Sequence, residues 1–237
     1  MRNIINIFGW YSLPIELLFA ILVYIKQLDY QKRKPQIRIT IVGLIAAIII
    51  LSPLFFSGSA EKIENWNMLA LSIVYSIACY VILVVVIYAI ADISIQDILY
   101  IANSSYLTQH LIHCANLEIC AFFKMTDNSY IEIMCFAIGY VLCYFKVAPA
   151  LISEKGCKKQ SLQELGTTVG VIAVAISLSA VVKELSIENR VLYMSCVAYA
   201  MIFCFYALWV EADRKKKAEL EEKLLLEQQC FVKYKEQ

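Results

Sequence analysis

The sequence predicts an all-α membrane protein, namely a polytopic bundle of about seven transmembrane helices followed by a C-terminal cytoplasmic helix. Of the 237 residues, 61% are hydrophobic and only 17% are charged, whereas a water-soluble domain is about half apolar and a quarter charged. Long runs have no charge, and a bilayer core requires roughly 20 apolar residues per helix. We predict spans over Ile7–Ile25, Ile39–Phe56, Met68–Ala91, Ile95–Phe123, Tyr130–Ile152, Leu165–Val182 and Val191–Val210.

The first three predicted spans are strongly apolar, with one exception. Glu16 lies near mid-depth of the first span. An isolated carboxylate is costly there, so we expect it to face protein, to be paired or to be protonated. The second span contains Pro53, which can kink a helix, and the third contains no charged residue.

The fourth predicted span, Ile95–Phe123, is the most polar of the seven. The charge pattern still favours a crossing, because without it the later basic clusters would lie on the face opposite the first cluster. Intramembrane polar side chains normally form hydrogen bonds inside a bundle. The polar residues of this span are Asn103, Gln109, His110, His113, Asn116 and Glu118.

The last three predicted spans contain features of packing and anchoring. Lys146 lies near the inner end of the fifth span, where a lysine usually extends to the headgroups. Pro149 can kink the same span. Gly166 and Gly170 form a G-x-x-x-G pattern in the sixth span, which allows close approach of helices.

Lysine and arginine residues predict a multi-pass protein of the plasma membrane with its amino terminus outside and its carboxyl terminus in the cytoplasm. Basic residues concentrate in cytoplasmic loops, and with seven spans all three basic clusters lie on one face. These runs are too short to suggest nucleic-acid binding. The clusters are Lys26, Lys32, Arg33, Lys34 and Arg38 after the first span, Lys155, Lys158 and Lys159 after the fifth, and Arg214, Lys215, Lys216 and Lys217 after the seventh.

The tail predicts a second unit, so we divide the chain into a transmembrane domain, residues 1–212, and a cytoplasmic helix, residues 213–237. The tail has no Gly or Pro and is rich in good helix formers. Residues spaced by four and three fall on one face, which favours pairing into a homodimer as in a coiled coil. The alternative is an amphipathic helix that lies on anionic headgroups. The face consists of Leu220, Leu224, Glu227, Phe231 and Tyr234.

The fourth span also contains the best candidate site. His110, Cys114 and Glu118 recur every four residues, and His113 is adjacent. Such residues could bind a metal, or a Cys and a His could form a thiol nucleophile. No second cluster completes either site, so we expect no metal, no cofactor and no catalytic residue. We expect ligand-binding or pocket-supporting roles for Gln109, His110, His113, Glu118 and Glu16.

The chain resembles the membrane sensor region of peptide-pheromone receptor histidine kinases of the accessory-gene-regulator type, whose cytoplasmic part contains a GHKL-type ATPase domain. The resemblance covers essentially the whole chain. It rests on the short-looped spans, on the polar fourth segment with its Gln109–His110 pair, and on the exit helix from Glu219 to Tyr234. It implies an extracellular peptide signal, often cyclic. In that family the linker continues into a phosphoacceptor histidine and an ATP-binding domain, and this sequence ends before either, so we expect no enzyme activity from it.

These observations predict the membrane sensor module of a two-component-type receptor, of the kind used in quorum sensing. A ligand would shift the helices and move the tail residues Leu220, Leu224, Phe231 and Tyr234. The first alternative is a small transporter or permease with a path through Glu16, Lys146 and the histidines, although the chain lacks the internal repeat typical of transporters. The second alternative is a membrane enzyme built on His110, His113 and Cys114.

Overall fold

The computed structural model describes residues 15–28, 65–122, 129–152, 166, 169–174, 177 and 190–235. This part is helical apart from short connections and contains no β-strand, which confirms the all-α class. Two of its helices, Ile133–Leu151 and Val191–Val232, are long and apolar enough to cross a membrane. The second predicted span and parts of the first and sixth lie outside the described residues, so the count of seven stays a prediction.

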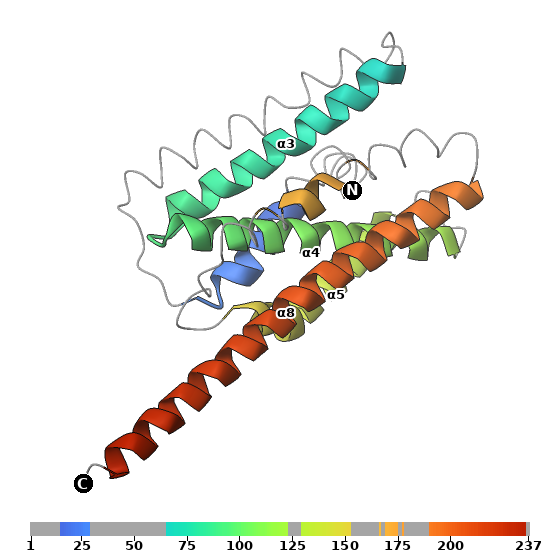
Figure 1. The fold of residues 1–237 in the computed structure, drawn as a ribbon. Helices are drawn as coiled ribbons and strands as arrows, with labels where there is room; N and C mark the ends of the chain where they lie inside the picture. Colours follow the sequence, from blue (N-terminus) through green and yellow to red (C-terminus); the bar gives the residue numbers. More distant parts are fainter. Residues whose placement is uncertain are drawn as a thin grey trace.

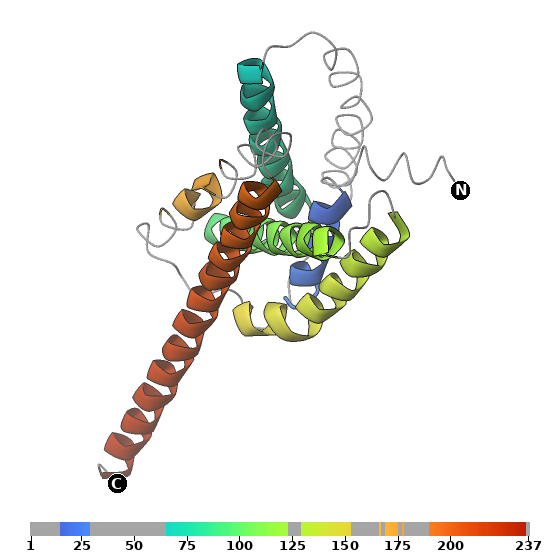
Figure 2. The ribbon, with the colours of Figure 1, turned by 90° about the vertical axis from the view of Figure 1, so that its right-hand side faces the viewer.

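Helix α4, Ile95–Phe122, lies at the centre of the bundle (Figures 1 and 2). It contacts α3 (Asn65–Ile90), α5 (Ser129–Leu142) and α8 (Arg190–Lys235). Every residue from 100 to 110 is buried. The most polar predicted span is therefore deeply enclosed by the described helices, and its neighbours must supply hydrogen-bond partners for its side chains.

Helix α3 forms against the local preference of its sequence. Residues 81–90 read VILVVVIYAI, and such β-branched residues favour strands in water. In lipid, however, every backbone amide and carbonyl must be bonded within the protein, and a helix achieves this within one segment. A helix over these residues is therefore what the predicted third span requires, despite their β-branched side chains.

A short capped connection joins α3 to α4. The hydroxyl of Ser94 accepts a hydrogen bond from the Asp97 amide at 3.2 Å, and it donates to the Asp97 carboxylate at 2.6 Å. This reciprocal pair resembles a capping box, which satisfies amides that the first helical turn leaves without a partner. The acidic connection before the fourth span thus begins that helix.

The fifth predicted span is a helix interrupted by a π-helical segment. Helix α5 continues into η1, Cys143–Val147, and then into α6, Ala148–Leu151. Pro149 explains the interruption, because proline lacks the amide that continues an α-helix and its ring crowds the preceding turn. The kink that the sequence predicts here takes the form of a π-bulge.

The bulge releases a backbone carbonyl, and a neighbouring helix uses it. The Ala148 amide bonds to the carbonyl of Cys143 rather than to that of Tyr144. The Tyr144 carbonyl instead accepts a hydrogen bond of 3.2 Å from Nε2 of Gln27. Because Gln27 lies two residues after the helix Ile15–Ile25, the bulge ties the end of that helix to the fifth span.

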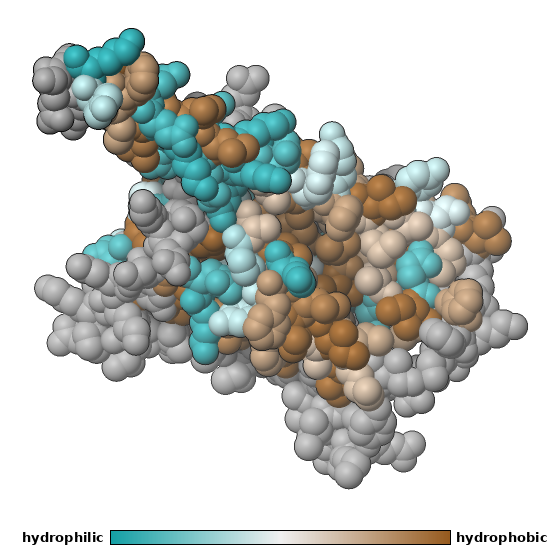
Figure 3. All heavy atoms as spheres, turned by 90° about the horizontal axis from the view of Figure 1, so that it is seen from below, coloured by the Kyte–Doolittle hydropathy of each residue, from teal (hydrophilic) through white to brown (hydrophobic). Residues whose placement is uncertain are grey.

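Helix α8 is continuous over 46 residues and is about 69 Å long. The predicted seventh span and the predicted cytoplasmic helix are therefore one helix. Cys204 and Leu208 belong to the buried core, whereas every described side chain from 219 to 235 is exposed. This end projects from the bundle (Figure 1), and its surface is largely hydrophilic with apolar patches (Figure 3). A helix that continues without a bend favours projection over the alternative of lying on the membrane surface.

Gly139 lets α5 approach α4 closely. A Cβ atom added there would lie 3.0 Å from Cγ2 of Ile112. At Gly170, by contrast, an added Cβ would have no atom of the described residues within 4 Å. A close approach of two helices is thus present at Gly139, whereas the G-x-x-x-G pair makes no such contact within the described part.

We predict that Gly139→Val lowers the free energy of unfolding by about 1–3 kcal/mol, the usual cost of overpacking. Gly170→Val is the matched control, since it adds the same side chain to an open helix surface and should cost less. A thermal melt in detergent with a thiol-reactive dye measures both, because Cys79, Cys114, Cys143 and Cys204 are buried and become reactive on unfolding. Equal melting temperatures for the two variants would contradict the close contact.

Candidate functional site

Buried polar side chains gather on α4 in the middle of the bundle. Burial of a polar group is costly unless it is hydrogen-bonded, so these residues depend on what surrounds them. Hydrogen bonds with the helix Ile15–Ile25 and with α3 satisfy several of them. The buried polar residues of α4 are Asn103, Ser104, Ser105, Thr108, Gln109, His110 and Asn116.

Glu16 lies at the meeting point of three helices and is only 2% exposed. Its Oε2 atom accepts a hydrogen bond of 2.7 Å from Nε2 of Gln109 and lies 3.9 Å from Nδ1 of His113. Its backbone carbonyl accepts a hydrogen bond of 2.8 Å from the hydroxyl of Tyr140 on α5. We call Glu16, Gln109, His113 and Tyr140 the carboxylate cluster. The Glu16 carboxyl and the His113 imidazole can each gain or lose a proton. The cluster can therefore exchange a proton, or it can replace its internal hydrogen bonds by hydrogen bonds to a polar ligand.

Two more tyrosines attach α4 to its neighbours. The hydroxyl of Tyr24 forms a hydrogen bond of 2.5 Å with the hydroxyl of Thr108. The hydroxyl of Tyr80, on α3, donates a hydrogen bond to Oδ1 of Asn103. Tyrosine suits this role because its ring packs among apolar groups while its hydroxyl reaches a polar one.

His110 lies on a different side of α4 from the carboxylate cluster. Successive residues are about 100° apart around a helix, whereas residues four apart share a face. Gln109 and His113 therefore point together toward Glu16. The ring of His110 stacks instead on Tyr106, with centroids 6.4 Å apart and planes 12° apart.

Glu118 lies one turn beyond Cys114 on α4, in the part of this helix that packs against α8. Cys114 contacts Val197 and Ala200 there, and Glu118 is half-buried. Cys114 thus packs against α8, whereas the ring of His110 stacks on Tyr106 of its own helix. Within the described ranges, no group of three or more His, Cys, Asp and Glu side chains is arranged to hold a metal ion.

Comparisons with protein-family models, with curated proteins and with solved structures found no match for this chain. Its function must therefore be inferred from its own contacts, burial and charge.

The tyrosine partners are the site residues that sequence reasoning missed. Tyr24, Tyr80 and Tyr140 lie in runs of apolar residues, where a tyrosine looks like one more hydrophobic residue. A usable signal was present, because the sequence contains 15 tyrosines and the fourth span needs buried donors. Which tyrosine meets which polar residue depends on how the helices pack.

The tail residues predicted to transmit a signal all lie on the projecting part of α8. They make up one face of that helix, and none of them belongs to the buried core of the described bundle. Their side chains are 51% (Leu220), 57% (Leu224), 59% (Phe231) and 78% (Tyr234) exposed. An exposed row of large apolar residues is typical of a surface that meets a partner.

Proposed function

We propose that this protein is the membrane sensor module of a receptor in the plasma membrane and that α8 transmits its state to the cytoplasm. One observation supports this above all: the helix that packs on α4 is the same unbroken helix that projects from the bundle. A displacement of α8 at its contact with α4 must reach the exposed end, because a continuous helix is stiff along its axis. We propose an outside amino terminus on the charge pattern of the loops.

The signal that we propose is an extracellular peptide, which is what the family resemblance implies. A ligand shifts a conformational equilibrium only when it binds the two states with different affinity. The carboxylate cluster supports such a difference, since its bonds join the helix Ile15–Ile25, α4 and α5. A peptide that alters these bonds would tilt or rotate α4, and α8 would follow through Cys114, Val197 and Ala200.

The output that we propose is a change in the pairing of two copies through the exposed face of α8. Leu220 and Leu224 begin this face, and Phe231 and Tyr234 continue it at spacings of four and three. In the family that the chain resembles, the following helices contain the phosphoacceptor histidine. The sensor module itself would then have no catalytic residue.

A chimera tests transmission without knowledge of the ligand. The kinase core of a histidine kinase is fused after Gln237, and one to seven alanines are inserted at the junction. Each residue rotates the attached core by about 100°, so autophosphorylation in membranes should rise and fall with insert length and should return after seven residues. A Gly-Gly-Ser insert of matched length should abolish this periodicity, and activity that does not depend on insert length would contradict the proposal.

A second candidate function follows from the approach of two protonatable groups, Glu16 and His113, in the bundle interior. Such a pair is found on proton paths of transporters. If the protein is a proton-coupled transporter, Glu16→Gln abolishes proton-driven uptake in proteoliposomes. If it is a receptor, proteoliposomes show no solute-dependent proton uptake, and the chimera retains its periodic output.

A further inference from the structure

Backbone carbonyls near the π-bulge tie three distant parts of the chain together at one end of the bundle. Nζ of Lys215, on α8, donates a hydrogen bond of 2.8 Å to the carbonyl of Pro149. The hydroxyl of Tyr100, near the start of α4, donates to the carbonyl of Leu151 at 3.2 Å. Together with the bond from Gln27 to this segment, these contacts place the end of the first helix and the middle of α8 at one level.

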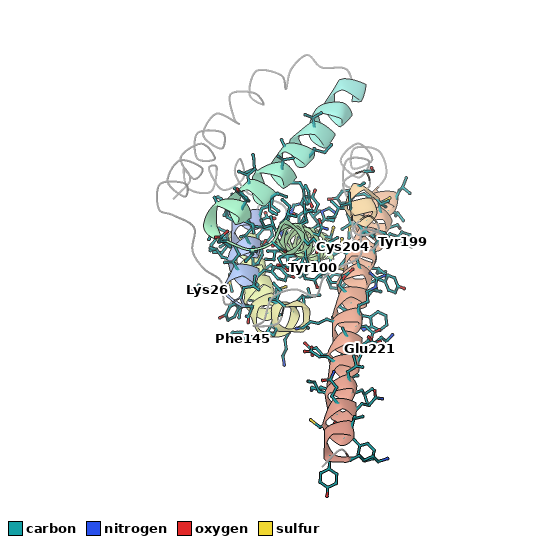
Figure 4. All side chains as sticks on the ribbon, turned by 60° about the vertical axis from the view of Figure 1, so that its left-hand side comes forward. Lys26, Tyr100, Phe145, Tyr199, Cys204 and Glu221 are labelled. Carbon is teal, nitrogen blue, oxygen red and sulfur yellow. The ribbon has the colours of Figure 1, made fainter. Side chains whose placement is uncertain are left out.

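Three exposed ammonium groups lie at this level, on three different segments. Lys26 precedes Gln27, Lys146 lies in η1, and Lys216 follows Lys215 on α8; all three are exposed. None of the three has a carboxylate of another described residue within ion-pair distance. In Figure 4, Lys26 and Phe145 lie level with the part of α8 between Cys204 and Glu221. We call Lys26, Lys146 and Lys216 the basic belt.

The neighbouring cations of α8 differ from the belt, because each has a carboxylate partner. Arg214 pairs with Glu211 at 3.1 Å, Lys215 with Glu219 at 3.7 Å and Lys217 with Asp213 at 2.7 Å. Such pairs compete with any outside anion for the cation. Among the described cations at this level, the three lysines of the belt are therefore the ones with no carboxylate of a described residue within ion-pair distance.

Exposed aromatic rings lie beside the belt, on the side of the bundle. Tyr206 and Trp209 precede Lys216 on α8 by about two to three turns, with ring centroids 6.0 Å apart. Phe145 is adjacent to Lys146 and is 67% exposed. Aromatic side chains gather where the headgroups meet the acyl chains, with cations just outside. This order of exposed rings and cations is the one expected where acyl chains meet headgroups.

We infer that the basic belt binds the phosphate groups of anionic phospholipids in the adjoining leaflet. An ammonium group at the membrane surface attracts an acidic lipid, and each such group raises the preference for it by about fivefold. Folding holds three cations at one level, none within ion-pair distance of a carboxylate of another described residue, and exposed aromatic rings lie on the same segments. The adjacent rings favour bilayer lipid over a free phosphate or a nucleic acid.

Native mass spectrometry of the full chain in detergent tests this, with equal amounts of phosphatidylglycerol and phosphatidylcholine as probes. We expect the wild-type protein to retain phosphatidylglycerol preferentially, and Lys26→Gln/Lys146→Gln to lose about 25-fold of that preference. The matched control is Lys223→Gln/Lys235→Gln, which removes the same charge from the projecting end of α8 and should keep the preference. An equal loss in both variants, or no loss in the first, would overturn the inference.

Salt dependence provides a second measurement on the unaltered protein, which matters if a variant fails to fold. The preference for phosphatidylglycerol should fall between about 0.05 M and 0.5 M salt, because exposed charges are screened over this range. Inorganic phosphate at the same ionic strength should compete no better than chloride does. A preference that does not change with salt, or strong competition by phosphate, would also overturn the inference.

Discussion

Replacing Gln109 by leucine should destabilise the bundle by about 2–3 kcal/mol, the usual cost of removing a hydrogen-bond donor from a buried carboxylate. Gln109 donates the 2.7 Å hydrogen bond to Glu16, and the Glu16 side chain is buried where water cannot replace the lost donor. Unfolding in mixed micelles with increasing dodecyl sulfate measures the change. Gln96→Leu is the control, because Gln96 is an exposed residue of the same helix, and it should have almost no effect.

The double variant Glu16→Leu/Gln109→Leu should be more stable than Gln109→Leu alone. When both partners of a buried polar pair become apolar, no unsatisfied group remains. The double-mutant cycle should therefore give a favourable coupling of at least about 1 kcal/mol. If the two single effects simply add, Glu16 and Gln109 do not depend on each other and the cluster does not join the helices.

Replacing Leu224 by glutamate should abolish the periodic output of the chimera and weaken association of two copies at least about tenfold. Leu224 lies on the same heptad face as Leu220, Phe231 and Tyr234. In a pair of Leu224→Glu copies, this face would bring the two new carboxylates together. Light scattering of the purified protein measures association, and autophosphorylation in membranes measures output.

Leu226→Glu separates pairing from a general effect of charge. Leu226 is 54% exposed and Leu224 is 57% exposed. Leu226 is two residues after Leu224, which is about 200° around the helix, so it lies off the predicted face. We expect Leu226→Glu to keep both association and output. If both variants behave alike, the exposed leucines contact something other than a second copy, such as the membrane surface.

The helices themselves were largely predictable. The predicted fourth span, Ile95–Phe123, differs from α4 by one residue at its end, because uncharged length and short polar connections mark helices in a bilayer. The union of the seventh span with the tail into α8 was also within reach, since no Gly or Pro interrupts residues 190–235. The π-bulge was only half predictable, because Pro149 indicates a kink but does not select its form.

The candidate site was predictable in residue type and not in arrangement. Gln109, His110 and His113 are conspicuous because polar residues are rare inside spans. Their separation onto different sides of α4 follows from helix geometry, but the partner of each side depends on the packing of other helices. Tyr140 is the clearest case, since nothing near it in sequence indicates a bond to the backbone of a residue 124 positions away.

Composition and local pattern are enough to predict helices and apolar, membrane-length segments, because lipid leaves the backbone no alternative to internal hydrogen bonds. They also require that Glu16 find a partner. That this partner is Gln109, 93 residues away, and that Lys215 meets the carbonyl of Pro149, emerge from folding. Such contacts join segments with no local relationship, and their formation depends on how every helix packs against the others.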